Sequence, residues 1–190
     1  MNEKIGVIVD GSGDYASLNR RFKETCKIVK TDGPRGHTAK PDDIASRSRK
    51  QISILKAFKC KKVVVVLDLE KRNVKYFSFL KDLENAFRKS EFGVEVEIAV
   101  PNIMIENWYL ADIKNLSKKK KFLKNDLKQK NYEGTHGKNE LKKLMEKKYS
   151  YSETVHGPQL FSVLCLATAR ENSPSFKNFL HLVEIDEFKT

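Results

Sequence analysis

Two apolar, β-branched segments constrain the fold of this chain more than any other feature. They span residues 4–10 and 62–68, and neither alternates apolar with polar residues. Such runs are typical of strands buried on both faces of a parallel sheet. Acidic residues stand at the end of each run: Asp10 in the first, and Asp68 and Glu70 in the second. Because the carboxyl ends of parallel strands share one edge of the sheet, we expect these acids to face one crevice.

The first hundred residues predict an alternation of strands and helices. The expected strands are 4–10, 26–30, 62–68 and 94–100, and the expected helices are 13–25, 41–59 and 76–90. A β-α-β-α-β-α-β order is typical of a parallel sheet wrapped by helices. The strand over 94–100 alternates valine or isoleucine with glutamate, so we expect it to be an edge or half-covered strand.

From residue 102 onward the pattern becomes helical. The expected helices are 103–116, 118–130, 138–148, 157–170 and 175–183, with a break rich in turn formers at 131–137. We therefore predict a Rossmannoid α/β core over residues 1–116. Residues 117–190 would form a basic helical extension packed on that core as one compact unit.

The acids at the strand ends suit a divalent cation. Carboxylate oxygens are the hard ligands that Mg²⁺ and Mn²⁺ prefer, so we expect Asp10, Asp68 and Glu70 to hold one of these ions. Asp14, in the Gly-Ser-Gly-Asp turn after the first strand, is a fourth candidate ligand. Such an ion can orient and polarise a phosphodiester. The alternative is that these acids cap helices, with Asp14 in a first helical turn.

Glu106 is a further candidate for the same site. Helical spacing places it in the middle of the apolar face formed by Ile103, Tyr109, Leu110 and Ile113. Burying a carboxylate there is costly unless a cation or hydrogen bonds compensate. Two explanations stay open: a buried ion pair with lysine or arginine, or a role beside the other acids at the metal.

Positive charge is concentrated in one segment. The net charge is +12, and residues 114–148 hold thirteen lysines and four acidic residues. This asymmetry favours a polyanionic partner such as DNA or RNA, although a solvated lysine-rich helical face would look the same. The residues expected to contact nucleic acid are Arg35, Lys118, Lys119, Lys120, Lys121, Lys124, His136 and Lys138.

Several classes of protein are disfavoured. No apolar run reaches the roughly 18 residues that span a bilayer, and no signal-peptide pattern precedes the first strand, so we expect a cytoplasmic protein with no membrane partner. Cys26, Cys60 and Cys165 are odd in number and widely spaced, which favours reduced thiols. The absence of GxxxxGK[ST] excludes a P-loop.

Two short motifs accompany the acids: Glu106-Asn107-Trp108 and Ser173-Pro174-Ser175-Phe176. The arrangement of acids at the strand ends resembles the Toprim fold of topoisomerases, primases and OLD-type nucleases, where a strand-end Glu-Gly and a later Asp-x-Asp bind Mg²⁺. The resemblance is closer to the small RloB-like proteins and the domain-of-unknown-function 4276 group, found in bacterial defence loci beside ATPases. These proteins combine the acidic strand ends with a Glu-x-Trp-like motif and a Ser-x-Ser-Phe helix start. Asp10 stands where that pattern has glutamate, and Glu70 where it has aspartate.

The resemblance implies a metal-dependent nuclease that cleaves DNA or RNA in anti-phage defence. Its catalytic residues would be Asp10, Asp68, Glu70 and Glu106, with Mg²⁺ or Mn²⁺ as cofactor and an ABC- or AAA-type ATPase encoded nearby as partner. The alternative is a non-catalytic subunit that binds nucleic acid or protein and works with such an ATPase.

Overall fold

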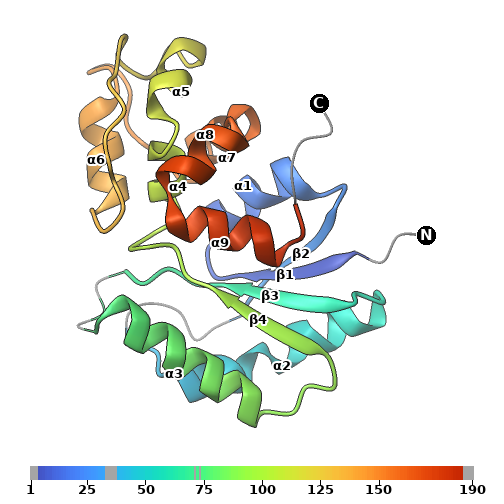
Figure 1. Cartoon of the computed structure of the whole chain (residues 1–190). Helices are drawn as coiled ribbons and strands as arrows, with labels where there is room; N and C mark the ends of the chain where they lie inside the picture. Colours follow the sequence, from blue (N-terminus) through green and yellow to red (C-terminus); the bar gives the residue numbers. More distant parts are fainter. Residues whose placement is uncertain (1–3, 33–37, 71, 73, 186–190) are drawn as a thin grey trace.

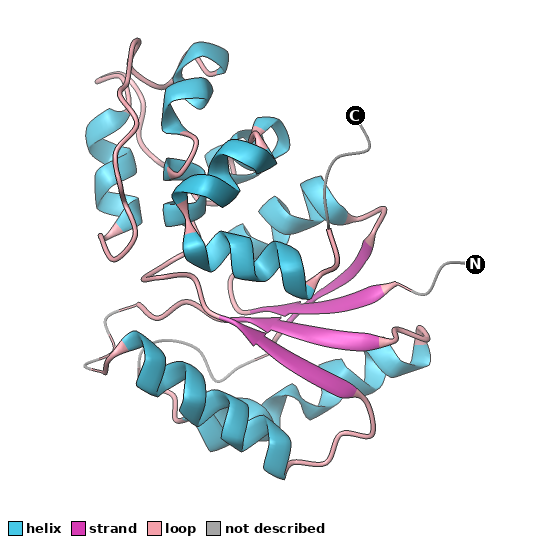
Figure 2. Cartoon of the chain, in the orientation of Figure 1, coloured by secondary structure: helices cyan, strands magenta, loops and turns pink. Residues whose placement is uncertain are grey.

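A computed structural model describes residues 4–32, 38–70, 72 and 74–185 of the chain. Within these residues, four parallel strands form one sheet in the order β2-β1-β3-β4, with helices on both faces (Figure 1 and Figure 2). The strands are β1 (Ile5–Val9), β2 (Cys26–Lys30), β3 (Lys62–Val66) and β4 (Glu95–Ala99). The predicted α/β architecture is confirmed, and β4 is an edge strand as its alternating sequence indicated.

Burial on both faces explains the unbroken apolar runs. All five residues of β1 are buried, and neighbouring residues belong to different apolar clusters. Val7 and Val9 contact one helical layer, whereas Ile8 contacts the other. An apolar residue is therefore needed at every position of this central strand.

Helices α2 (Pro41–Ala57) and α3 (Tyr76–Lys89) cover one face of the sheet (Figure 1). The apolar residues that face the sheet, such as Leu55 and Leu83, are fully buried in a cluster with Ile8 and Val65. Phe79, Leu83 and Phe87 follow one another at helical spacing on α3, and all three are buried. This layer is built entirely from the crossover connections of the parallel sheet.

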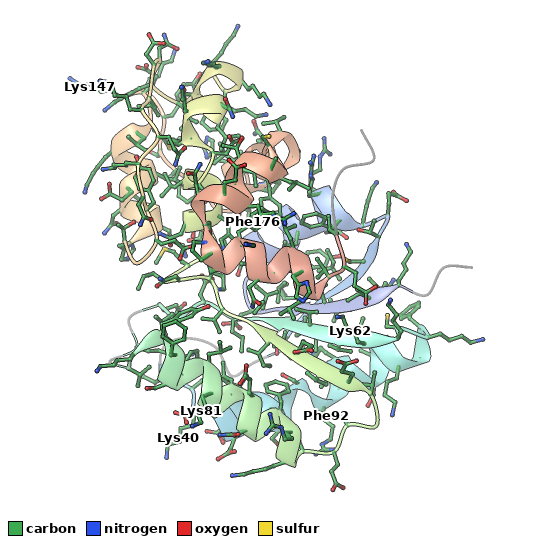
Figure 3. All side chains as sticks on the ribbon, viewed as in Figure 1. Lys40, Lys62, Lys81, Phe92, Lys147 and Phe176 are labelled. Carbon is green, nitrogen blue, oxygen red and sulfur yellow. The ribbon has the colours of Figure 1, made fainter. Side chains whose placement is uncertain are left out.

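The other face is covered by α1 and by the C-terminal helices (Figure 1). These elements are α1 (Ser12–Phe22), α4 (Glu106–Leu110), α5 (Ile113–Lys119), α6 (Gly137–Leu144), α7 (His156–Val163), α8 (Leu166–Asn172) and α9 (Pro174–Leu182). Helices α5 and α6 lie to one side of the sheet, where they pack on α7 and α4 (Figure 1). Trp108 stacks on Phe179 with ring centroids 4.9 Å apart, and Phe22 meets Phe161 edge-on at 5.6 Å. Figure 3 shows Phe176 inside this layer and Phe92 on the opposite side of the sheet.

The predicted helix over 118–130 is wrong. Helix α5 ends at Lys119, and Leu123 then forms an isolated antiparallel bridge with Met145, which buries both side chains. Beyond it, Asp126 has a φ of 55°, which belongs to a turn and not to a right-handed helix. The same bridge ends the predicted 138–148 helix early, at Leu144.

Two other predicted helices, 103–116 and 157–170, are each interrupted. The same buried carboxylate, that of Asp112, accepts hydrogen bonds at both interruptions. Asp112 lies between α4 and α5, where its Oδ1 accepts a hydrogen bond of 2.6 Å from the side-chain amide of Asn115. Its Oδ2 accepts a 2.8 Å hydrogen bond from the main-chain N–H of Cys165, between α7 and α8. Breaking the helices provides the polar partners that this buried carboxylate requires.

No helix in the described part of the chain is long and apolar enough to cross a lipid bilayer. All three cysteines carry free thiols, with Cys26 and Cys60 buried.

Phe161 tests whether the C-terminal helices are part of the core. Its side chain is fully buried, whereas Phe77 on α3 is 79% exposed. We expect Phe161→Ala to lower the free energy of unfolding by about 3–5 kcal/mol, measured by urea denaturation. Phe77→Ala, the matched control, should change it by less than about 0.5 kcal/mol. Equal effects of the two substitutions would show that the helical layer does not contribute to the core.

Candidate functional site

The acids predicted from the strand ends meet at the carboxyl edge of the sheet. Strands β1 and β3 are adjacent, with Val9 in register with Val66, so the residues that follow them emerge side by side. Asp68 Oδ1 accepts a 3.0 Å hydrogen bond from the main-chain N–H of Ile105, in the segment that follows β4. The edge therefore joins the ends of three strands, as expected for a ligand crevice in an open α/β sheet.

The backbone at this edge is strained. Glu70 has a φ of 53° and Ile103 a φ of 87°, and the main-chain N–H of Glu70 donates a 2.8 Å hydrogen bond to the carbonyl of Ile103. A positive φ is rare for any residue with a side chain and rarest for a β-branched one. Such strain persists only where the surrounding structure enforces it, and it is concentrated at functional sites.

Glu106 is the most buried acid of the site. Its side chain is 1% exposed, which confirms the burial expected from helical spacing. Oε1 accepts a 2.9 Å hydrogen bond from the hydroxyl of Tyr151, while Oε2 is buried with no hydrogen-bond partner among the described residues. No lysine or arginine nitrogen of the described residues forms an ion pair with this carboxylate. An orphaned carboxylate oxygen is a position at which a cation would be stabilising.

Asp14, Asp68 and Glu106 form an inner group of acids. Burial raises the pKa of Glu106 to about 7, an effect that Lys138 opposes and Asp14 reinforces. Burial likewise raises the pKa of Asp14 to about 6, and burial together with Asp14 and Glu106 raises that of Asp68 well above its usual value. The three carboxylates therefore repel one another where water is largely excluded.

Asp14 is also a helix residue, as the alternative interpretation supposed. It lies in the first turn of α1, and its Oδ2 accepts a 3.2 Å hydrogen bond from the main-chain N–H of Gly11. This contact uses one carboxylate oxygen, so capping and a second role at the site are compatible.

Lys138 brings positive charge to the inner acids. Its Nζ lies 2.7 Å from a carboxylate oxygen of Glu153. Burial alone would lower the pKa of Lys138, but Glu106, Glu153 and Asp68 together raise it above its usual value. The ammonium group is therefore a fixed counter-charge for the site.

Close packing of two glycines positions Lys138 and Glu153. A Cβ atom on Gly137 would lie 2.8 Å from the Cβ of Glu106, and one on Gly13 would lie 2.7 Å from the Cβ of Glu153. Only glycine permits these approaches, which bring α6 against α4, and the segment before α7 against α1.

Asn107 holds the segment that leads into α6. Its side-chain amide donates hydrogen bonds to the carbonyls of Tyr132 and Thr135, at 2.5 and 3.1 Å. The break predicted at 131–137 is thus fastened directly to the residue that follows Glu106.

Asp10 and Glu70 form an outer pair that faces a different cation. Burial lowers the pKa of Arg72, while the charges of Glu70 and Asp10 oppose that effect. The guanidinium lies 4.5 Å from the ring centroid of Phe79, and its Nη1 donates a 2.9 Å hydrogen bond to the carbonyl of Ala39. Asp10 also raises the pKa of Asp14, and Glu70 raises that of Asp68, so this pair adjoins the inner acids.

The predicted nucleic-acid contacts are only partly brought together. Lys138 lies among the acids, but Lys118, Lys119, Lys120, Lys121 and Lys124 lie on α5 and the segment that follows it. These five lysines form no ion pair with a carboxylate of the described residues. Burial, Arg20 and Lys119 lower the pKa of Lys120, which indicates cations gathered close together.

Of the two remaining predicted nucleic-acid contacts, the structure describes His136 but not Arg35. His136 precedes α6, and its Nδ1 is buried with no hydrogen-bond partner among the described residues. Arg35 lies outside the described residues.

Sequence reasoning missed Tyr151, Glu153 and Arg72. The first two lie in the segment before α7, where His156 Nδ1 accepts a 3.0 Å hydrogen bond from the main-chain N–H of Ser152. This segment has no apolar periodicity, so nothing in its pattern points to the site. The one available signal was indirect, because a carboxylate buried at position 106 requires a donor from elsewhere.

The Ser-Pro-Ser-Phe motif and Trp108 serve the fold. Ser173 Oγ accepts a 3.1 Å hydrogen bond from the main-chain N–H of Phe176 and so caps α9. Ser175 Oγ accepts a 2.9 Å hydrogen bond from Trp108 Nε1 and donates one of 2.8 Å to Glu133. The two motifs meet because they pack α9 against α4.

The donor set fits a hard divalent cation. Mutually repelling carboxylates and the orphaned Oε2 of Glu106 would all be stabilised by Mg²⁺ or Mn²⁺. No three His, Cys, Asp or Glu side chains of the described residues are already arranged to hold an ion. Binding would therefore require carboxylates at the edge to rotate toward one another.

The raised pKa values predict how stability depends on pH. Burial holds the pKa of Glu106 at about 7, against a usual 4.5, so the folded protein keeps a proton that the unfolded chain releases. Between about pH 4.5 and about pH 7, this group's contribution to stability falls as the pH rises. Urea denaturation without divalent cations should show this fall in wild type and a flatter profile in Glu106→Gln.

A matched variant isolates that effect. Glu171→Gln, at an exposed position of α8, should leave the wild-type pH profile unchanged. If the wild-type and Glu106→Gln profiles run parallel, burial does not raise the pKa of Glu106.

Comparison with known proteins gives one match. No curated protein and no solved structure matches the sequence significantly. The family model described as "Domain of unknown function (DUF4276)" matches residues 5–184, which include all four strands and every acid of the site. The chain belongs to the DUF4276 family.

Proposed function

We propose that this protein is a Mg²⁺- or Mn²⁺-dependent nuclease that hydrolyses phosphodiester bonds in DNA or RNA. The observation that carries the proposal is the gathering of Asp10, Asp14, Asp68, Glu70 and Glu106 at the carboxyl edge of a parallel sheet. Burying several carboxylates together raises the free energy of the folded protein unless a cation or a substrate binds to them.

Each residue of the site has a proposed role that follows from its position. Asp10, Asp68 and Glu70 would hold the ion, and Asp14 would complete its ligand set. When bound, the ion would polarise the phosphodiester and lower the pKa of an attacking water. Glu106, whose Oε2 has no hydrogen-bond partner among the described residues, would join Asp14 in completing that ligand set. Lys138 and Arg72 would offset the charge of the phosphate.

The lysines on α5 and the segment after it supply a surface for the nucleic-acid strand. Lys118, Lys120 and Lys121 belong to a cluster without carboxylate partners among the described residues. Phosphate contacts by such lysines give affinity without sequence preference and depend steeply on salt.

The resemblance to Toprim proteins also supports metal-dependent phosphodiester cleavage and suggests the biological process in which it takes place. Small proteins of this kind occur beside ATPases in bacterial defence loci, so we place the activity in anti-phage defence, with an ABC- or AAA-type ATPase as partner. Asp10 and Glu70 exchange the two carboxylate lengths of that pattern but keep its number of acids.

Cleavage assays with Asp68→Asn test the proposal directly. Purified protein with Mg²⁺ or Mn²⁺ should cleave DNA or tRNA, and Asp68→Asn should lower the rate by more than about 100-fold, since it removes one charged ligand. Asp82→Asn, an identical change at an exposed position of α3, should leave the rate unchanged. Cleavage that survives in Asp68→Asn would show that the assigned site is wrong.

The position of the Lys138 ammonium group among the acids supports a second candidate function. Because its ammonium already neutralises part of the inner group, the acids could be structural, and the protein would then be a non-catalytic binding subunit of an ATPase. Lys138→Ala distinguishes the two functions, since it leaves the acids without their counter-charge.

We expect Lys138→Ala to lower the melting temperature, and Mg²⁺ or Mn²⁺ to restore it by occupying the acids. Lys142→Ala, at an exposed position of the same helix, is the matched control. If neither cation raises the melting temperature of wild type or Lys138→Ala, the acids do not bind these ions, which favours the second function.

A further inference from the structure

The outer edge of β4 is open, and a groove runs along it. In the described residues β4 pairs only with β3, so its other edge has no neighbouring strand. Two hollows of about 530 Å³ and 470 Å³ lie along this edge, and both are lined by Glu84 and Glu97. Helix α3 forms one wall, and α9 forms the other wall of the larger hollow (Figure 1). We call the two hollows together the β4 groove.

The main chain of β4 has hydrogen-bonding groups available to a partner. The carbonyl of Ala99 accepts a 3.2 Å hydrogen bond from the N–H of Leu67, so Ala99 faces the sheet. Because these directions alternate along a strand, Val96 and Ile98 point their N–H and C=O groups outward. Within the described residues these groups have no partner. The next outward carbonyl, that of Val100, accepts a 3.1 Å hydrogen bond from Tyr76.

The α3 wall of the groove exposes apolar side chains. Phe77 is 79% exposed, and Tyr76 and Leu80 beside it are half-buried. An extended segment lying against β4 would cover these side chains while pairing with the strand, which is how sheet edges capture peptides.

The groove is acidic although the protein carries a net charge of +12. Glu97 is in register with Val64, whose side chain belongs to the cluster under α9, so Glu97 points to the α9 side. Burial raises the pKa of Glu97, Glu95 and Glu84 raise it further, and Lys62 opposes them. The two hollows are lined by Glu84, Glu91, Glu97 and Glu133 against one basic residue, Arg88, so the groove is acidic on balance. Such charge complements a basic partner.

We propose that the β4 groove binds an extended basic segment of another protein, which adds to the sheet as a strand beside β4. Alternate side chains of the segment would then point to opposite walls. Lysine or arginine at every second position would face Glu95 and Glu97, and apolar residues between them would cover Phe77. A second copy of the chain is disfavoured, because pairing of two β4 edges would place glutamates opposite one another.

Peptide binding to the full-length protein tests this proposal. The probe is a fluorescently labelled peptide of about eight residues that alternates lysine with valine, and its affinity is measured by anisotropy. We expect it to bind at least about tenfold more tightly than a glutamate–valine peptide or the same peptide with a central proline. Equal binding of the proline peptide would overturn strand addition.

Variants of the protein identify the surface. Glu84→Lys combined with Glu97→Lys should weaken binding of the basic peptide about tenfold and strengthen binding of the glutamate–valine peptide. Glu24→Lys, an exposed charge reversal remote from the groove, should change neither affinity. Phe77→Ala should weaken binding without changing the melting temperature.

Two results would place the peptide elsewhere and overturn the proposal. The first is loss of binding in Asp68→Asn or on addition of Mg²⁺, which would mean that the peptide occupies the acidic site. The second is a concentration-dependent dimer, in sedimentation, that the Glu84→Lys and Glu97→Lys changes disrupt, which would make a second copy the occupant. Neither result depends on nuclease activity.

Discussion

The cost of burying several carboxylates together, increased by their mutual repulsion, is the physical constraint on which the candidate site depends. The parallel sheet brings Asp68 to the same edge as Asp14, and α4 adds Glu106 from above. Each additional buried carboxylate raises the free energy of the folded protein unless a positive charge or a hydrogen bond compensates for it. Lys138 and the hydroxyl of Tyr151 supply part of that compensation, and both come from the C-terminal half of the chain.

The C-terminal half is therefore both core and site. Its aromatic residues, among them Phe161 and Phe176, fill one face of the sheet. Helix α6 carries Lys138, and the segment before α7 carries Glu153, to the acidic edge through contacts that only Gly137 and Gly13 allow. The predicted boundary at residue 116 separates an α/β pattern from a helical one, but the apolar cluster continues across it.

Local patterns were sufficient to predict the sheet and the positions of its acids. Unbroken apolar runs locate β1 and β3, and helical spacing places Glu106 on a buried face, because both signals arise within a few neighbouring residues. The helix interruptions at Asp112 could not be predicted, since that carboxylate is satisfied by Cys165, fifty-three positions away. Glu153 was missed for the same reason: its role depends on a tertiary contact with Gly13.

Gly13 contacts Glu153, a residue far along the chain, so the acidic edge cannot be completed early during synthesis. A ribosome releases the N-terminal residues first, so β1, β3 and their acids emerge before Lys138 and Glu153. The complete acidic edge can therefore form only after residue 153 has left the ribosome, because the contact of Lys138 with Glu153 and that of Glu153 with Gly13 are both part of it.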